Sequence, residues 1–348
     1  MELLNKILKK KEFRKYDKIK EYNIKIYEKS DFEDMMELYE NVFPGYMSNK
    51  LWLWKNIKNP FGKFYTIIMK DNDKIIAAYS VAPKEFNIYG IYYKCVQSLD
   101  TMTLENYRGL GISTYLGKLT YEYARIKGSK FVYGFPNINS SYLFSVKLEW
   151  NYCDKPSLFI KNLSKNIEII KESKSFSIRK IKKFNDKINN FWEIYKNNYP
   201  IIIKKDDQYL NWRFKNHPFV DYKKFVIVDN DSNDIISYFV LKEYRDNKGN
   251  VFGHIVDFLI GPQELSLKKE IFTVIENFSL KKFKDNCSNI SFWLPDEALK
   301  EFVLKKLGYS LTQSIPFFGY KIFHKEKQLY PLTSLKNWYI TMSNNDIF

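Results

Sequence analysis

The sequence predicts an α/β protein with mixed sheets, built from two tandem copies of one unit. Three observations predict this fold class. A strand-like run passes through a two-glycine turn into a helix-like run, short segments recur at a nearly constant spacing, and both halves of the chain show the same order of strands and helices. At 348 residues the chain is long enough for two domains, each with a sizeable core.

The duplication rests on three separate matches between the two halves. They are Trp54 with Trp212, Pro136 with Pro295, and Trp150 with Tyr309, at offsets of 158, 159 and 159 residues. Similarity at one offset is typical of a repeated structural unit. The sequence therefore predicts a first unit at residues 23–163 and a second at residues 174–324. A basic amphipathic segment at residues 1–22 precedes them, and a tail at residues 325–348 follows.

The elements of each unit follow from local patterns. Alternating apolar residues predict strands, apolar residues three or four positions apart predict amphipathic helices, and Asp/Asn clusters between β-type runs predict hairpins. The predicted order is strand, helix, tryptophan-containing helix, hairpin, long central strand, helix, strand ending in proline, helix and final strand. The first unit shows it at residues 23–27, 32–42, 64–69, 75–82, 92–104 and 114–127, and the second at residues 176–181, 186–195, 225–228, 235–243 and 251–260.

The turn after the long strand of the first unit carries the main functional signal. Gly109 and Gly111 let successive backbone N–H groups converge on one point, and the positive end of the helix dipole lies behind them. Arg108 can pair with a phosphate oxygen through its fork of donors. The turn predicts a cradle for a diphosphate, although an ordinary tight turn shows the same pattern. It is neither a Walker loop nor the three-glycine dinucleotide fingerprint, because the residue types and spacing differ.

The form Arg108-x-x-Gly111-x-Ser113 resembles the acetyl-CoA pyrophosphate loop of the GNAT superfamily of N-acyltransferases, in which the last position is Gly or Ala. The order of strands and helices is also similar to the GNAT order, so the resemblance covers nearly the whole chain. It implies two tandem GNAT units. The second is expected to be degenerate, because residues 260–264 replace the loop there and Pro262 removes an N–H donor.

The resemblance also implies acetyl-CoA as the acyl donor and a set of residues that hold it. The turn would hold the diphosphate, backbone N–H groups at the end of the long strand would polarise the thioester carbonyl, and Asn137 would lie near the pantetheine arm. No metal is expected. The expected cofactor-binding residues are Met102, Thr103, Leu104, Arg108, Gly109, Leu110, Gly111, Ile112, Ser113, Thr114 and Asn137.

The resemblance leaves the catalytic acid and base open. Family members often carry a Tyr on the helix that follows, but the counted positions hold Phe144 and Ser145 here. Tyr142, one helical turn before Ser145, is the candidate acid. Asp100 is the candidate base. It aligns with Asp257 of the second unit, and a carboxylate present in both units argues for a structural role; water would then remove the proton.

Composition limits the partners. The net charge is +16, but only six basic residues are arginine, so we interpret the charge as a solvated lysine surface and expect no nucleic acid. The three cysteines and three histidines show no metal-ligand spacing. No apolar run approaches the roughly 18 residues of a membrane span, and no secretory signal pattern is present. We therefore expect a cytoplasmic protein without a membrane span, and a homodimer is compatible with the sequence.

The function implied by the resemblance is the transfer of an acetyl group from acetyl-CoA to the amine of a small molecule. Residues 99–103 and 133–137 are similar to uncharacterised bacterial GNAT proteins that act on an amino sugar or nucleotide sugar. Two alternatives stay open. One is an aminoacyltransferase of the peptidoglycan-bridge type, a tandem GNAT that uses aminoacyl-tRNA and lacks a working CoA loop. The other is a non-catalytic acyl-CoA-binding module.

Overall fold

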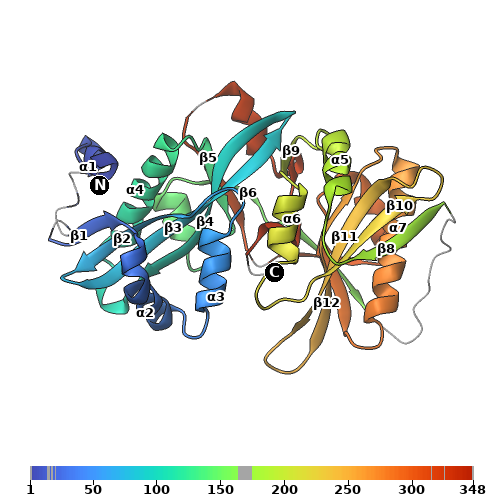
Figure 1. The fold of residues 1–348 in the computed structure, drawn as a ribbon, viewed down its shortest axis with the longest axis horizontal. Coiled ribbons are helices and arrows are strands. Elements are labelled where there is room, and N and C mark those ends of the chain that lie inside the picture. Colours follow the sequence, from blue (N-terminus) through green and yellow to red (C-terminus); the bar gives the residue numbers. More distant parts are fainter. Residues whose placement is uncertain are drawn as a thin grey trace. The chain divides into compact units, whose positions relative to one another are not determined.

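The computed structural model describes residues 2–13, 16, 19, 21–163, 175–314, 316–324 and 326–346. The chain divides into two compact units, each assembled from three segments. The first comprises Met1–Phe86, Tyr92–Asp154 and Pro316–Thr333, and the second comprises Asn87–Ile91, Lys155–Ile315 and Ser334–Phe348. Each unit has its own sheet with helices packed against it (Figure 1). The predicted α/β fold class with two mixed sheets is confirmed.

The sheet of the first unit has the strand order β1-β2-β3-β4-β5-β15-β6. β4 and β5 are parallel, and α4 provides the crossover connection that parallel neighbours require. The pairs β1–β2, β2–β3, β5–β15 and β15–β6 are antiparallel. The strands are β1 (Asn23–Ile26), β2 (Tyr65–Asp71), β3 (Lys74–Ile88), β4 (Ile91–Thr103), β5 (Phe131–Gly134), β6 (Asn151–Asp154) and β15 (Phe318–Ile322).

Alternation along β2 divides the core of the first unit into two layers. Ile67 and Met69 pack in the cluster that includes α1 and α4, whereas Ile68 packs with α2 and α3. Successive side chains of a strand point to opposite faces, so both faces of the sheet are covered by helices. These helices are α1 (Glu2–Leu8), α2 (Phe32–Val42), α3 (Asn49–Trp52), which a π-helical turn η4 (Leu53–Ile57) continues, and α4 (Ile112–Ile126).

The seven-stranded sheet of the second unit has the strand order β14-β7-β13-β12-β11-β10-β8; β9 and β16 pair in parallel with each other and are not part of this sheet. Its core includes Phe258 of β12, Phe272 of α7 and Phe292 of β13. The strands are β7 (Ser157–Asn162), β8 (Phe176–Ile181), β9 (Ile201–Ile203), β10 (Lys223–Asp229), β11 (Ile235–Arg245), β12 (Val251–Ile260), β13 (Asn289–Trp293), β14 (Ser310–Gln313) and β16 (Trp338–Tyr339). The helices are α5 (Asp186–Tyr195), α6 (Asp207–Phe214), α7 (Leu265–Phe283) and α8 (Lys300–Lys305).

Two strands join a different sheet from the one that the repeat boundaries imply. β7 ends the predicted first unit but pairs with β13 and β14. β15 ends the predicted second unit but pairs with β5 and β6. Two copies of one pattern end in similar strands, so local sequence does not specify which sheet each strand completes. The predicted boundaries at residues 163 and 174 therefore do not separate the two sheets.

The predicted basic segment at residues 1–22 packs on the first unit wherever it is described. α1 buries Leu4 and Ile7 in the core cluster that it shares with α4, and Lys10 forms an ion pair with Glu122 of α4.

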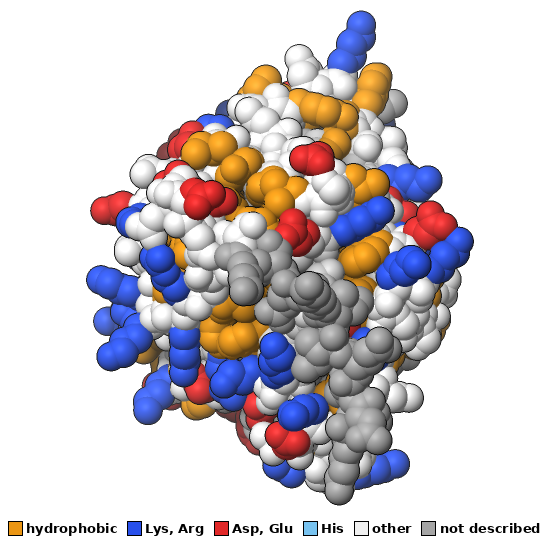
Figure 2. All heavy atoms as spheres, turned by 90° about the vertical axis from the view of Figure 1, so that its right-hand side faces the viewer, with side chains coloured by type: hydrophobic (Ala, Val, Ile, Leu, Met, Phe, Trp, Pro, Cys, Tyr) orange, Lys and Arg blue, Asp and Glu red, His pale blue; other side chains and the backbone are white. Residues whose placement is uncertain are grey.

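Among the described residues, no helix combines the length and apolar character of a membrane span. On the face in Figure 2, lysine and arginine side chains are interspersed with acidic and apolar ones, as on a solvated surface.

Acidification is expected to weaken the second unit through His254 of β12, whose Nδ1 lies 2.8 Å from Ser291 Oγ. Burial, and then the charge of Lys242, lower the pKa of His254 to about 4. An unfolded histidine titrates near pH ~6.5. The unfolded state therefore binds more protons between these two values, and stability falls as the pH falls through that window.

Between pH 7 and pH 5, His254 should lower the free energy of unfolding of the wild-type protein by up to about 2 kcal/mol. His254→Gln should abolish this part of the loss. Urea unfolding at both pH values would measure it. His324, an exposed histidine, provides the control, because His324→Gln should keep the wild-type pH dependence. Equal pH dependence of His254→Gln and the wild type would contradict this account.

Candidate functional site

The central strands of the first unit part before β4 ends. Their parallel pairing joins Val96 with Val132 and Gln97 with Tyr133. β5 then ends at Gly134, whereas β4 runs on to Thr103. The last residues of β4 therefore present a backbone edge beyond the end of β5, which is the place that the sequence predicted for the thioester and the pantetheine arm.

The backbone at the end of β4 is oriented by its bonds to β3. The Leu104 N–H donates to the Ile76 carbonyl at 2.9 Å, so this N–H is not available to a ligand. N–H groups of neighbouring strand residues point to opposite edges, so the Thr103 N–H faces away from β3. The Thr103 carbonyl accepts a bond from Arg108 Nε at 3.3 Å. Of the three predicted residues, which also include Met102, Thr103 has the N–H best placed for an oxyanion.

The loop that follows has the open geometry of an anion cradle. Gly109 and Gly111 adopt φ values of 82° and 83°, in the left-handed region that only glycine enters readily. Both are exposed, and an added Cβ on either would meet nothing within 4 Å. Gly111 is the N-cap of α4 and has no side chain, so no side-chain cap from this residue bonds to the N–H groups of the first turn.

Side-chain bonds tie this loop to the strand. Thr103 Oγ1 and Ser113 Oγ lie 3.0 Å apart, which joins the end of β4 to the first turn of α4. Tyr107, in the short 3₁₀ turn before Arg108, donates its hydroxyl to Asp71 at 2.7 Å. Thr103, Arg108 and Ser113 are therefore brought together as predicted, and they border the open first turn of α4, which also contains Ile112 and Thr114. Leu110 packs against the core cluster beneath the loop.

Asp100, the predicted base, is held in a buried ion pair. Its Oδ1 lies 2.9 Å from Lys55 Nζ, and both side chains are 5% exposed. Its φ of 42° marks an irregularity in β4, as at a β-bulge. Burial, and then the charge of Asp100, raise the pKa of the nearby Tyr39 hydroxyl well above its usual value. These contacts favour a structural role for Asp100, in which its carboxylate holds the irregular part of β4 in place.

The second unit repeats this buried pair. Asp257 of β12 lies 2.8 Å from Lys205 Nζ, and both side chains are fully buried. The carboxylate of Asp257 also accepts bonds from the hydroxyls of Tyr238 and Thr341. Sequence analysis missed Lys55 as the partner of Asp100. The available signal was that its repeat counterpart, Arg213, is also basic.

Asn137 and Tyr142 lie in the turn and helix after β5. Asn137 Oδ1 accepts bonds from the Ser140 N–H at 3.0 Å and from Ser140 Oγ at 3.1 Å, so Asn137 caps this turn. Tyr142 is 59% exposed, and Lys147 Nζ lies 5.5 Å from the centre of its ring. Within the described part of the chain, no bond joins Tyr142 to Thr103 or to the glycine loop.

The corresponding stretch of the second unit differs at the end of the strand and at the start of the helix. An added Cβ on Gly261 would lie 2.5 Å from the ring of Tyr195. Glu264 stands at the N-cap of α7, where a carboxylate would repel a phosphate. Beside the strand edge, the Tyr339 hydroxyl donates to the Phe258 carbonyl at 2.6 Å. The start of α7 is exposed, but it lacks the two left-handed glycines that precede α4.

The comparisons with known proteins agree with this geometry. Residues 23–153 match the family model of an acetyltransferase (GNAT) domain. A search of curated proteins finds no match.

Solved structures are similar in fold at 10–12% identity. A conserved protein from Enterococcus faecalis, described as a probable N-acyltransferase, is 12% identical, with 86% of this chain and 72% of that chain covered and a TM-score of 0.67. A GCN5-related N-acetyltransferase from Anabaena variabilis is 12% identical, with 87% and 73% covered and a TM-score of 0.63. The N-myristoyltransferase of Saccharomyces cerevisiae, with bound myristoyl-CoA, is 10% identical, with 86% and 78% covered and a TM-score of 0.56.

Proposed function

Because residues 23–153 match a GNAT acetyltransferase domain, we propose that this chain transfers an acetyl group from acetyl-CoA to the amine of a small molecule. The observation that carries the proposal is the loop at Arg108–Gly111. Its two left-handed glycines precede the first turn of α4 beside the strand edge beyond β5, and the start of α7 in the second unit lacks such glycines.

The residues of the loop fit the diphosphate of an acyl-CoA. Exposed N–H groups at a helix N-terminus favour an anion, and Arg108 adds a guanidinium whose Nε is held by the Thr103 carbonyl. The fit supports acyl-CoA as the donor.

In the proposed reaction the amine nitrogen attacks the thioester carbonyl, a C–N bond forms, and the C–S bond breaks. The Thr103 N–H would stabilise the developing oxyanion, and Tyr142 would protonate the leaving thiolate. Asp100 is engaged by Lys55, which supports a structural role for it. We therefore propose that water carries away the proton of the amine.

The acceptor is proposed as an amino sugar or a nucleotide sugar, and the acyl group as acetyl. Because the fold is similar to that of an N-myristoyltransferase, the length of the acyl chain should also be tested. Purified protein would be incubated with acetyl-CoA, octanoyl-CoA or myristoyl-CoA and a panel of amines that includes glucosamine phosphates. Products would be followed by mass spectrometry, because the half-buried Cys153 complicates the use of thiol reagents.

Acylation of any amine in the panel would support the proposal and identify the acyl group. Binding of acyl-CoA without turnover of any amine would favour the non-catalytic binding module. Absence of binding of every acyl-CoA would overturn the proposal.

Tyr142→Phe is expected to lower kcat by roughly a hundredfold while leaving the KM for the acyl-CoA unchanged, since it removes a proton donor but no group of the loop. Tyr330→Phe, at another tyrosine that is 61% exposed, is the matched control and should keep the wild-type kcat. Steady-state kinetics would measure both variants. A wild-type kcat for Tyr142→Phe would show that Tyr142 is not the acid.

A further inference from the structure

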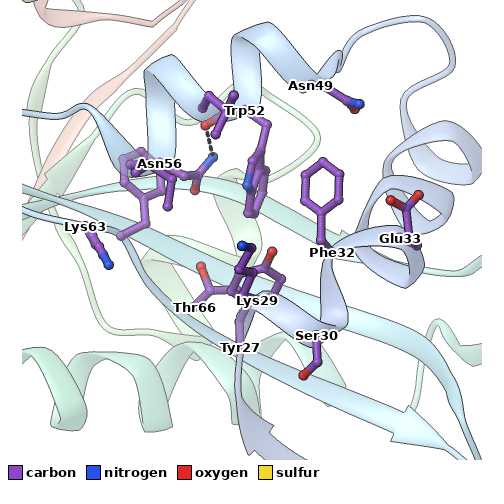
Figure 3. Close-up of a pocket in the computed structure, with 13 residues that line it drawn as sticks. Tyr27, Lys29, Ser30, Phe32, Glu33, Asn49, Trp52, Asn56, Lys63 and Thr66 are labelled. Atoms are coloured by element: carbon purple, nitrogen blue, oxygen red, sulfur yellow. Dashed lines mark hydrogen bonds between the residues drawn. The ribbon is translucent and has the colours of Figure 1, made fainter.

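A second groove opens in the first unit, away from the glycine loop. It is a cavity of about 810 Å³ between the start of α2 and the α3–η4 helix, with β1 and β2 below it (Figure 3). No residue of the loop at 103–114 or of the parted end of β4 lines it. We propose that this groove binds a phosphorylated sugar, and this inference does not depend on the acyl-transfer proposal.

The first observation is a buried polar atom without a partner. Asn56 is 2% exposed and lines the cavity. Its Nδ2 donates to the Trp52 carbonyl at 3.4 Å, but its Oδ1 has no hydrogen-bond partner among the described residues. Figure 3 shows the nitrogen turned toward the helix and the oxygen turned away from it, into the space above Thr66. A buried amide oxygen left unpaired is costly, so a ligand with an N–H or O–H donor would stabilise it.

The second observation comes from the repeat. At the corresponding place the second unit keeps only a smaller cavity, of about 230 Å³, between β8, the start of α5 and β10, and no residue of α6 lines it. Two positions of the repeat differ at the offset of 158 residues that relates Trp54 to Trp212: Leu53 and Asn56 correspond to Asn211 and Phe214. Both atoms of the Asn211 side-chain amide bond to the backbone of Phe184, at 3.0 and 2.9 Å, and Phe214 is 1% exposed.

In the first unit the same two positions leave the groove open. Leu53 is 47% exposed along the cavity, and the polar Asn56 takes the place of the buried phenylalanine. Both lie in the π-helical turn η4, a distortion that is frequent at functional sites. The open groove is therefore a feature of the first unit that the shared fold does not require.

The chemistry of the walls selects the ligand. Tyr27 and Phe32, which are partly exposed, line the groove around the buried Trp52, and such aromatic rings can pack against the apolar face of a sugar. Asn56 offers only an acceptor, which suits a hydroxyl group. Lys29 and Lys63 line the groove, are exposed, and form no ion pair with another described residue, so they can bind a phosphate.

Calorimetric titration of the full chain tests the inference, with glucosamine 1-phosphate, UDP-glucose, glucose and inorganic phosphate as probes. The first two contain a sugar phosphate as a monoester and as a nucleotide diphosphate, so the better of them identifies the source. We expect at least one to bind below about 1 mM and at least tenfold more tightly than glucose or phosphate alone. Equal binding of phosphate alone, or no binding of either sugar phosphate, would overturn the proposal.

Single and double substitutions test whether the sugar phosphate binds in this groove. Lys63→Glu should weaken binding at least tenfold, whereas Lys58→Glu, at an exposed lysine outside the groove, should have no effect. The double variant Leu53→Asn/Asn56→Phe carries the residues of the second unit at these two positions, and it should abolish binding of the sugar phosphate. Acetyl-CoA affinity should be unchanged in all of these variants, which separates failure here from failure of the acyl-transfer proposal. Unchanged sugar phosphate binding by Lys63→Glu would show that the ligand lies elsewhere.

Discussion

Gly111→Val is expected to weaken acetyl-CoA binding by at least about a hundredfold. Hydrogen bonds to a charged group contribute roughly 1.5–3 kcal/mol each, and two lost bonds correspond to about that factor. The loss has two causes. A valine at φ 83° would distort the N-cap of α4, and its branched side chain would fill the space where the N–H groups point. Isothermal titration with acetyl-CoA would measure the change.

Gly249→Val is the matched control for this experiment. Gly249 has a φ of 86°, and an added Cβ there would also meet nothing within 4 Å, but it lies in a hairpin of the second unit. A left-handed residue other than glycine costs roughly 1–2 kcal/mol, so both variants should lose similar stability. Only Gly111→Val should lose binding. Equal affinities of the two variants would show that the loop does not hold the diphosphate.

Lys205→Met is expected to destabilise the second unit by about 3–5 kcal/mol, because it leaves the Asp257 carboxylate buried without its cation. The bonds from Tyr238 and Thr341 remain, but they do not neutralise a charge in a fully buried place. For a unit of this size the loss corresponds to roughly 10 °C in Tm. Thermal unfolding followed by circular dichroism would measure it.

Two further variants test the cause of this loss. Lys305→Met breaks an exposed pair with Glu301, whose side chains are 72% and 76% exposed, and should change stability by less than about 1 kcal/mol. Lys205→Met combined with Asp257→Leu removes both buried charges and should recover most of the stability. If the double variant is no more stable than Lys205→Met, the loss comes from packing rather than from the unpaired charge.

Local patterns were sufficient where a structural feature depends on neighbouring residues. The glycines at 109 and 111 predicted a turn between a strand and a helix, because the conformation is set within the turn; α4 begins at Ile112, two residues before the predicted start. The offset of Trp54 and Trp212 predicted two similar α/β halves. The roles of the site residues stay predictions, and the hydroxyl contact between Thr103 and Ser113 shows only that these two side chains lie together.

The sequence by itself determined the fold class, the order of the elements and the open glycine loop, because each is encoded by periodicity or by backbone freedom over a few residues. The tertiary structure alone decided which sheet β7 and β15 join, since the two repeats end in similar strands and local sequence does not specify the partners of either. It also decided that Asp100 pairs with Lys55 and that Asn56 Oδ1 has no hydrogen-bond partner among the described residues. Those features depend on contacts between residues far apart in the chain, or on the space around a side chain, and no local pattern specifies either.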